Sequence, residues 1–422
     1  MLTDMLEVKE QLQTEIHGRL EMDREMTDEE IGEVIDAVIM NKSKEMYLSA
    51  SSKLILRQDL FNAIRRLDLL QELVDDREIT EIMVNGSDSI FYEKNGRISR
   101  WDKTFPSREK LQNVIRQIVS RSDRVVNESC PIVDARLHDG SRVNVVLDPV
   151  ALNGPILTIR KFPDRAISMQ DLIRWGSVTA EAAEYLKTLV RAGYNIFVSG
   201  ATSSGKTTFL NVLADYIPKS SRIITIEDSA ELQIHGIANL VRLEARQANA
   251  DKENSVTIRD LIRTSLRMRP DRIIVGEVRG AEALDMIQAM NTGHDGSLST
   301  GHANSPEDML ARIETMILLG ADMPLRAIRQ QIASSIDVIV HLGRLRDHTR
   351  RVMEITELLS SSDEGYIMNP IFRFCEADDM LSETMVYNDE IIGQVRGELR
   401  RTGNHLQNRR KLRSCALESP EL

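Results

Sequence analysis

The sequence is poor in cysteine and lacks a membrane-spanning run. Its cysteines, Cys130, Cys375 and Cys415, are scattered without metal-type spacing, which argues against a disulfide framework and suits a reducing compartment. No stretch approaches the roughly 20 consecutive apolar residues that cross a bilayer. The start of the chain has no basic region followed by an apolar core, as a secretory signal would. We therefore expect a cytoplasmic protein.

Basic residues are also outnumbered by acidic ones, with 54 Lys and Arg against 65 Asp and Glu, which gives a net charge of −11. Residues 1–40 hold twelve acidic and three basic side chains, and a balance of this kind disfavours direct nucleic-acid binding, which needs a concentrated basic face. The exception is 396–413, with seven Lys or Arg and one Glu. This segment fits a solvated helix or disordered end, or a patch that binds lipid or a partner.

The remaining composition, 41% hydrophobic and 28% charged, is that of a globular protein, and 422 residues suggest two or three domains. Helical spacing in "DEEIGEVIDAVI" predicts a helical extension over 1–53. Short alternating runs such as "ITEIMVNG", "RVNVVLDP" and "ILTIRKF" predict strands of an N-terminal α/β domain over 54–163. A second domain follows over 164–374, and 375–422 is expected to be a C-terminal tail.

The second domain alternates β-branched apolar runs with helical stretches. The runs lie at 222–228, 272–278, 297–303 and 337–343. This alternation predicts an α/β fold with a mostly parallel sheet, in which ligands bind at the carboxyl ends of the strands.

One loop of this domain, "GATSSGKTT", joins an apolar strand to a helix. Its spacing matches the phosphate-binding loop, in which backbone N–H groups at a helix start cradle phosphate oxygens. Lys206 would reach the β- and γ-phosphates, and Thr207 would help to hold Mg²⁺. The predicted nucleotide-binding residues are Gly200, Ala201, Thr202, Ser203, Ser204, Gly205, Lys206, Thr207 and Thr208.

Several carboxylates fall at predicted strand ends near this loop. Glu277 ends "RIIVGE", with Gly276 where an aspartate is usual, so Glu277 must act alone. Glu227 and Asp228 end another strand, with Glu231 expected one helical turn further on. Each could be a helix cap or a solvated charge, but together they favour a metal-dependent phosphate chemistry.

Two histidines, His294 and His302, bracket the short run "DGSLSTG". A zinc site is a poor interpretation, because no cysteine accompanies them and their spacing fits no common zinc motif. Hydrogen bonding near the phosphates is the better one.

Taken in order, "GATSSGKTT", "TIEDSAELQ", "RPDRIIVGEVRGAEA" and "TGHDGSLSTGHANSP" resemble the Walker A motif, Asp box, Walker B motif and His box of the type II/type IV secretion ATPases. With "ITEIMVNG", "DARLHDGSRVN" and "LTIRKF", the likeness is greatest to the CpaF-type ATPases of tight-adherence pili. It runs from about residue 60 to 359. The family's optional tetracysteine zinc module does not occur in this chain.

This resemblance implies a homo-hexamer of subunits, each with a PAS-like N-terminal domain and a RecA-like ATPase domain that use ATP and Mg²⁺. It implies that Glu227 is the general base and Glu277 the Mg²⁺-linked acid. By the same likeness His302 senses the γ-phosphate, with His294 beside it.

The family also brings arginines from the N-terminal domain to the phosphates. Arg142 and Arg160 match the strands concerned, and Arg136 is a weaker candidate, although an exposed strand arginine is often only solvated. Other arginines that could serve at a subunit boundary are Arg267, Arg269 and Arg279.

The function implied is a cytoplasmic ATPase motor at the inner face of the membrane, where it works on a pilus platform protein. Peripheral association would come through that partner. The alternatives are the ATPase of a type IV secretion or conjugation channel, and a nucleotide-gated scaffold that does not turn over. Intact Lys206, Glu227, Glu277 and His302 argue against the scaffold.

Overall fold

The computed structural model describes residues 2–20, 26–94, 96–120, 125–162, 166–246, 255–377, 384–387, 390–393 and 395–417. The chain divides into two compact units, Met1–Arg165 and Ala166–Leu422. The domain boundary expected at residue 163 falls within 163–165, which lie outside the described residues.

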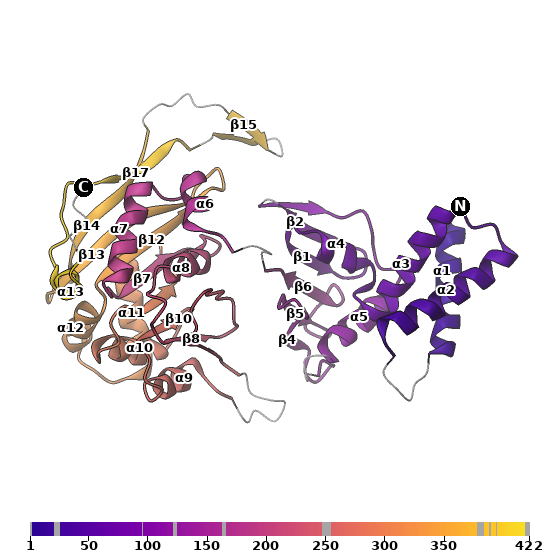
Figure 1. The fold of residues 1–422 in the computed structure, drawn as a ribbon, viewed down its shortest axis with the longest axis horizontal. Helices are drawn as coiled ribbons and strands as arrows, with labels where there is room; N and C mark the ends of the chain where they lie inside the picture. Colours follow the sequence, from indigo (N-terminus) through magenta and orange to yellow (C-terminus); the bar gives the residue numbers. More distant parts are fainter. Residues whose placement is uncertain are drawn as a thin grey trace. The chain divides into compact units, whose positions relative to one another are not determined.

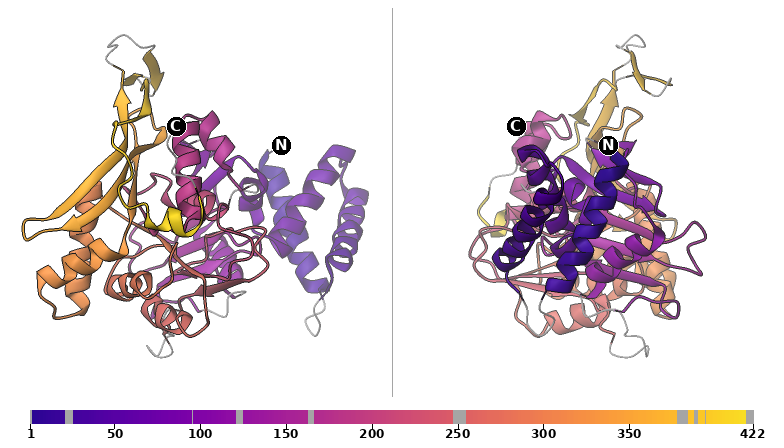
Figure 2. Two further views of the ribbon diagram at one scale, coloured as in Figure 1. Left: turned by 60° about the vertical axis from the view of Figure 1, so that its left-hand side comes forward. Right: turned by 90° about the vertical axis from the view of Figure 1, so that its right-hand side faces the viewer.

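The first unit begins with three helices that lie side by side (Figure 2). They are α1 (Leu2–Arg19), α2 (Asp28–Glu45) and α3 (Ala50–Arg65). Thr27 and Glu30 start α2 with a capping box, in which each side chain accepts a hydrogen bond from the backbone of the other. The boundary expected at residue 53 falls inside α3, and Leu56 and Leu60 of this helix belong to the helical core.

A six-stranded antiparallel sheet completes this unit, in the order β3-β2-β1-β6-β5-β4. Val143 and Val145 of β5 point into its core, and the residues between them face the other side, as a period of two requires. The elements are η1 (Asp68–Leu70), α4 (Gln71–Asp75), β1 (Ile79–Asn85), β2 (Ile90–Lys94), β3 (Arg97–Arg100), α5 (Arg108–Ser120), β4 (Ile132–Arg136), β5 (Arg142–Val146) and β6 (Ile156–Arg160).

The second unit is built on a nine-stranded sheet in the order β17-β14-β13-β12-β7-β11-β10-β8-β9. The pairs from β12 to β9 are parallel and the others antiparallel, which confirms the predicted largely parallel sheet. Its strands are β7 (Ile196–Gly200), β8 (Ile223–Glu227), β9 (Leu240–Glu244), β10 (Arg272–Val275), β11 (Leu298–Gly301), β12 (Val338–Arg344), β13 (Arg350–Ser361), β14 (Tyr366–Glu376) and β17 (Gly397–Arg401). A separate pair consists of β15 (Thr384–Tyr387) and β16 (Glu390–Gly393).

Helices cover both faces of this sheet (Figure 1). Ile196 and Val198 of β7 pack against α7 and α8, whereas Phe197 between them packs against the helices of the other face. The helices are α6 (Met169–Arg174), α7 (Ala180–Arg191), α8 (Lys206–Ala214), α9 (Ile258–Ser265), α10 (Glu282–Asn291), α11 (Pro306–Gly320), α12 (Leu325–Ser335) and α13 (Arg410–Ser414). Strands buried on both sides explain the continuous apolar runs in the sequence.

The basic segment near the end of the chain is part of this unit, unlike the solvated or disordered tail expected from its composition. Strand β17 pairs with β14, and Leu399, Leu406 and Leu412 are buried in the main core. No helix among the described residues is long and apolar enough to cross a membrane.

Candidate functional site

The phosphate loop has the expected setting between β7 and α8, with Lys206 as the first residue of the helix. Ser203 and Gly205 take left-handed backbone conformations, with φ of 61° and 93°. At Gly200 a Cβ atom would come within 2.5 Å of the Leu342 carbonyl oxygen and of Ser204 Oγ, so only glycine fits. The loop therefore turns tightly over the start of α8, where N–H groups can hold an anion.

Lys206 begins a chain of polar contacts across the carboxyl edge of the sheet. Its Nζ donates to the Ala201 carbonyl at 3.1 Å and to His302 Nδ1 at 3.2 Å. His302 Nε2 lies 2.9 Å from Glu277 Oε1. The other oxygen of Glu277 accepts from Arg279 Nη2 at 2.9 Å. Residues from three separate motifs thus meet beside the phosphate loop, as strand ends of a parallel sheet should.

Burial and neighbouring charges shift the pKa values of two residues in this series of contacts, Lys206 and His302. Burial lowers the pKa of Lys206, and Glu277 partly opposes this. Burial also lowers the pKa of His302, with Lys206, Arg279 and Arg312 adding to the effect against Glu277. His302 is therefore neutral at neutral pH, with Nδ1 free of a proton to accept from Lys206 and the proton on Nε2, the ring nitrogen nearer to Glu277.

Glu227, at the end of β8, is only 3% exposed. Its Oε1 accepts from the backbone N–H groups of Glu231 at 2.7 Å and Leu232 at 2.8 Å. These contacts orient the carboxylate and order the irregular segment after β8. The expected helical turn to Glu231 is wrong, because no helix occurs between β8 and β9.

Gly276, which stands where an aspartate was expected, lies against Glu227. A Cβ atom at this position would come within 3.0 Å of Glu227 Cγ, which is tighter than ordinary packing. An aspartate here would therefore displace Glu227. The absence of an aspartate at position 276 and the burial of Glu227 are therefore linked by close packing between these two positions.

His294 does not lie beside His302, so that expectation needs correction. The two residues stand at opposite ends of β11, His294 before Leu298 and His302 directly after Gly301. His294 Nδ1 is instead 3.2 Å from the Ala289 carbonyl at the end of α10. His294 lies at the amino edge of the sheet, away from the phosphate loop, because β11 crosses the sheet between His294 and His302.

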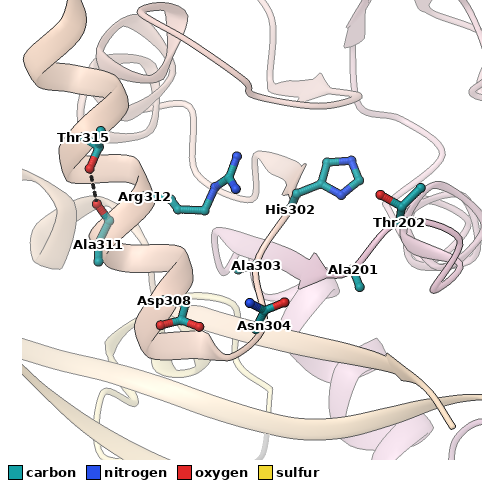
Figure 3. A pocket seen from close by; sticks show the side chains of 9 residues that line it. All are labelled: Ala201, Thr202, His302, Ala303, Asn304, Asp308, Ala311, Arg312 and Thr315. Carbon is teal, nitrogen blue, oxygen red and sulfur yellow. Dashed lines mark hydrogen bonds between the residues drawn. The ribbon is translucent and has the colours of Figure 1, made fainter. Parts of the chain in front are cut away.

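A cavity of about 500 Å³ opens beside the phosphate loop (Figure 3). One side is formed by Ala201 and Thr202 of the loop, and the other by α11, from which Arg312 extends towards His302 (Figure 3). Sequence reasoning missed this contribution of α11. The signal was present, because the lining residues recur at helical spacing. The lining consists of Ala201, Thr202, His302, Ala303, Asn304, Asp308, Ala311, Arg312 and Thr315.

A second missed contact comes from β13. Arg350 Nε donates to the Ser203 carbonyl at 2.8 Å and so supports the phosphate loop from outside. No local pattern marks this arginine, since a residue 147 positions away is joined to the loop only through the pairing of the sheet.

The oxygen donors near the loop suit Mg²⁺. Glu277 offers a carboxylate that is 21% exposed, and Thr207 a hydroxyl in the first turn of α8. Among the described residues no group of three or more His, Cys, Asp or Glu converges to form a complete protein cage. That donor set fits a magnesium ion that takes most of its ligands from phosphate and water.

The candidate arginines of the first unit stand in a row. Arg136 of β4 is the register partner of Arg142 of β5, which is the partner of Arg160 of β6. All three side chains leave the same, non-core face of the sheet. Glu81 of β1 lies opposite Arg160, with 3.7 Å between Glu81 Oε1 and Arg160 Nη2.

The fold and the phosphate loop define the class of nucleotide-binding proteins with a RecA-like sheet. The model of the type II/IV secretion system protein family matches residues 65–416 of this chain, which belongs to that family. The type IV secretion system protein PtlH of Bordetella pertussis is 32% identical over 315 residues, which cover 68% of this chain and 93% of PtlH.

Two solved structures are similar to this chain. The VirB11 ATPase from the Brucella suis type IV secretion system, solved with sulphate, is 30% identical over 68% of this chain and 94% of its own, at a TM-score of 0.38. The ATPase DotB of Yersinia pseudotuberculosis shares the fold, with a TM-score of 0.51 and 19% identity over 70% of this chain and 79% of its own.

Proposed function

We propose that this protein is an ATP-hydrolysing motor. The observation that carries the proposal is the contact chain from Lys206 through His302 to Glu277, directly beside a phosphate loop. Lys206 would hold the β- and γ-phosphates, and Thr207 and Glu277 would hold Mg²⁺, which neutralises charge on the phosphates. His302, neutral and placed between Lys206 and Glu277, would detect the terminal phosphate. His294 takes no part, since it lies at the other edge of the sheet.

Glu227 is proposed as the group that activates water. Its carboxylate is buried, fixed by two backbone N–H groups, and packed against Gly276 at the strand end next to Glu277. A fixed, desolvated carboxylate is suited to orient and deprotonate a water molecule in line with the terminal phosphate.

The arginine row of β4, β5 and β6 supports a role for the first unit. Its three guanidinium groups stand in register on directly neighbouring strands and leave the same face of the sheet, with Glu81 opposite Arg160. Arginine pairs well with phosphate, so a row of this kind is suited to meet an anion. We propose that Arg142 and Arg160, with Arg136, contact the phosphates of ATP.

The motor is proposed to work as a homo-hexamer at the cytoplasmic face of the inner membrane, bound to a platform protein, without direct nucleic-acid binding. The motifs most resemble the tight-adherence pilus ATPases, which favours pilus assembly. A second candidate is a type IV secretion channel, favoured by the likeness to PtlH and VirB11. Deleting the gene separates the two, because only the first role predicts loss of surface pili without loss of substrate export.

The catalytic proposal is tested by two substitutions. Lys206→Ala should nearly abolish ATP hydrolysis and weaken nucleotide binding. Glu227→Gln should leave binding within about twofold of the parent and reduce turnover by at least about a hundredfold, as expected of a group that acts on water. Phosphate release measures turnover, and a fluorescent nucleotide measures binding. Hydrolysis by Glu227→Gln at the parent rate would transfer the base role to Glu277.

A further inference from the structure

A buried histidine outside the motifs joins two parts of the nucleotide site. His341 lies on β12 and is 8% exposed. Its register partner on β7 is Ser199, which directly precedes Gly200 of the phosphate loop, and its Nδ1 is 2.9 Å from Ser199 Oγ. The same ring also contacts the backbone of Asn304, two residues after His302 and in the wall of the cavity. One imidazole therefore bridges the base of the phosphate loop and the segment that carries His302.

The protonation state of this ring suits a bridge. Burial lowers the pKa of His341, although Glu307 and Asp308 of α11 and the Asn304 backbone oppose this shift. A neutral imidazole has one donor and one acceptor. The Ser199 hydroxyl can donate to Nδ1, which leaves Nε2–H as the donor available to the Asn304 carbonyl.

The sheet is also irregular next to His341. The ladder between β12 and β13 shifts register between His341 and Leu342, where β13 carries one extra residue, Met353. The next residue, Leu342, is the β12 partner of Gly200, with its carbonyl oxygen 2.5 Å from where a Cβ of that glycine would be. The bulge, the bridge and the tight start of the loop thus coincide within two residues.

We propose that His341 is a positioning residue that sets the distance between the phosphate loop and His302. The inference rests on the proposed ATPase function, because His302 must meet the terminal phosphate that Lys206 holds. A ring that only fills space would not need contacts on both nitrogens.

The test compares His341→Leu, which removes both contacts, with His341→Asn and His341→Gln. The Asn amide can replace the contact of Nδ1 and the Gln amide that of Nε2. We expect His341→Leu to lower kcat at least about tenfold with KM within about twofold, and the two amides to recover part of this loss. Ser199→Ala should lower kcat in the same direction and add little to His341→Leu, since both break one bridge.

Thr356→Val is the matched control, since it removes a buried hydroxyl from β13 away from the loop. It should leave kcat at the parent value. Near-parental kcat in both His341→Leu and Ser199→Ala would overturn the inference. So would equal losses in the Leu, Asn and Gln variants, which would indicate packing alone.

Amide hydrogen exchange separates this inference from the proposed function. His341→Leu should raise the exchange rate of residues 300–304 whether or not the protein hydrolyses ATP, and unchanged exchange there would contradict the bridge. Hydrolysis by the parent, set against Lys206→Ala, decides the function on its own.

Discussion

Individual residues at the site owe their chemistry to the partners that the fold supplies. His302 could be predicted from its motif, but its neutral state could not, because burial and the cations Lys206, Arg279 and Arg312 lower its pKa together. Arg312 belongs to α11, and nothing in the motifs links it to His302. Glu227 was likewise predictable as a strand-end acid, whereas its burial and its backbone donors follow from the three-dimensional structure.

The shift of His302 predicts a pH dependence. Protonation at Nδ1 would remove the acceptor of Lys206, so kcat/KM should fall on the acid side, at a pH below the usual histidine pKa of about 6.5. Replacing Arg312 by Gln removes a charge that lowers this pKa. The acid limb should therefore move to higher pH in Arg312→Gln, as measured by kcat/KM from pH 5 to 8.

Arg326, an exposed arginine of α12, provides the control, since Arg326→Gln should leave the acid limb in place. A shift to lower pH in Arg312→Gln would contradict the electrostatic account of His302.

At the scale of elements, the sequence predicted which segments form helices or strands better than it predicted how the strands pair. The buried parallel strands β8, β10, β11 and β12 were located because β-branched runs are distinctive. The antiparallel edge of β13, β14 and β17 was missed, since nothing local separates these strands from loops or tail. The register between paired strands could not be predicted from the sequence either. A slip of one residue would turn Arg142 into the core, so the arginine row could only be seen in the folded sheet.

The arginine row predicts a loss of activity without a matching loss of stability. Arg142→Ala should lower ATP turnover at least about tenfold if the arginine meets phosphate, while the melting temperature stays close to that of the parent, because this side chain lies outside the core. Phosphate release and thermal unfolding measure the two effects. Arg100→Ala, an exposed arginine of β3 at the other edge of the same sheet, should change neither.

Parallel losses of activity and stability in Arg142→Ala would instead assign this arginine a structural role. Light scattering on the same sample shows whether the proposed homo-hexamer has been retained, so that a loss of assembly is not mistaken for a loss of catalysis.

At the scale of the whole molecule, the C-terminal segment closes the second unit. Buried Glu357 accepts from the backbone N–H groups of Gln407 at 2.9 Å and Asn408 at 2.7 Å. Lys411 Nζ lies 2.7 Å from Asp337 Oδ2 and 2.7 Å from Asp295 Oδ1. Composition alone suggested a solvated tail, because the apolar residues that dock it are only a few among many charges.

Lys411→Met should therefore destabilise the protein. Burial raises the pKa of Asp337 and Lys411 opposes this, so removing the cation leaves a buried carboxylate poorly compensated. The expected cost is about 3 kcal/mol in the free energy of unfolding. Denaturant unfolding measures it, with Arg410→Gln, an exposed neighbour on α13, as the control. A loss no larger than that of the control would mean that the ion pair contributes nothing to stability.

The closure by α13 has a consequence for synthesis on the ribosome. Tyr194, just before the strand that carries the phosphate loop, donates its hydroxyl proton to the Asn408 carbonyl, across 214 residues of sequence. Domains fold largely in the order in which they are translated, but a contact of this separation has to wait. The first unit can fold while translation continues, whereas the second cannot complete its structure until Lys411 and Leu412 have left the exit tunnel. A ribosome that stops early therefore releases a chain whose second core stays open to proteases, so we expect prematurely terminated copies to be degraded.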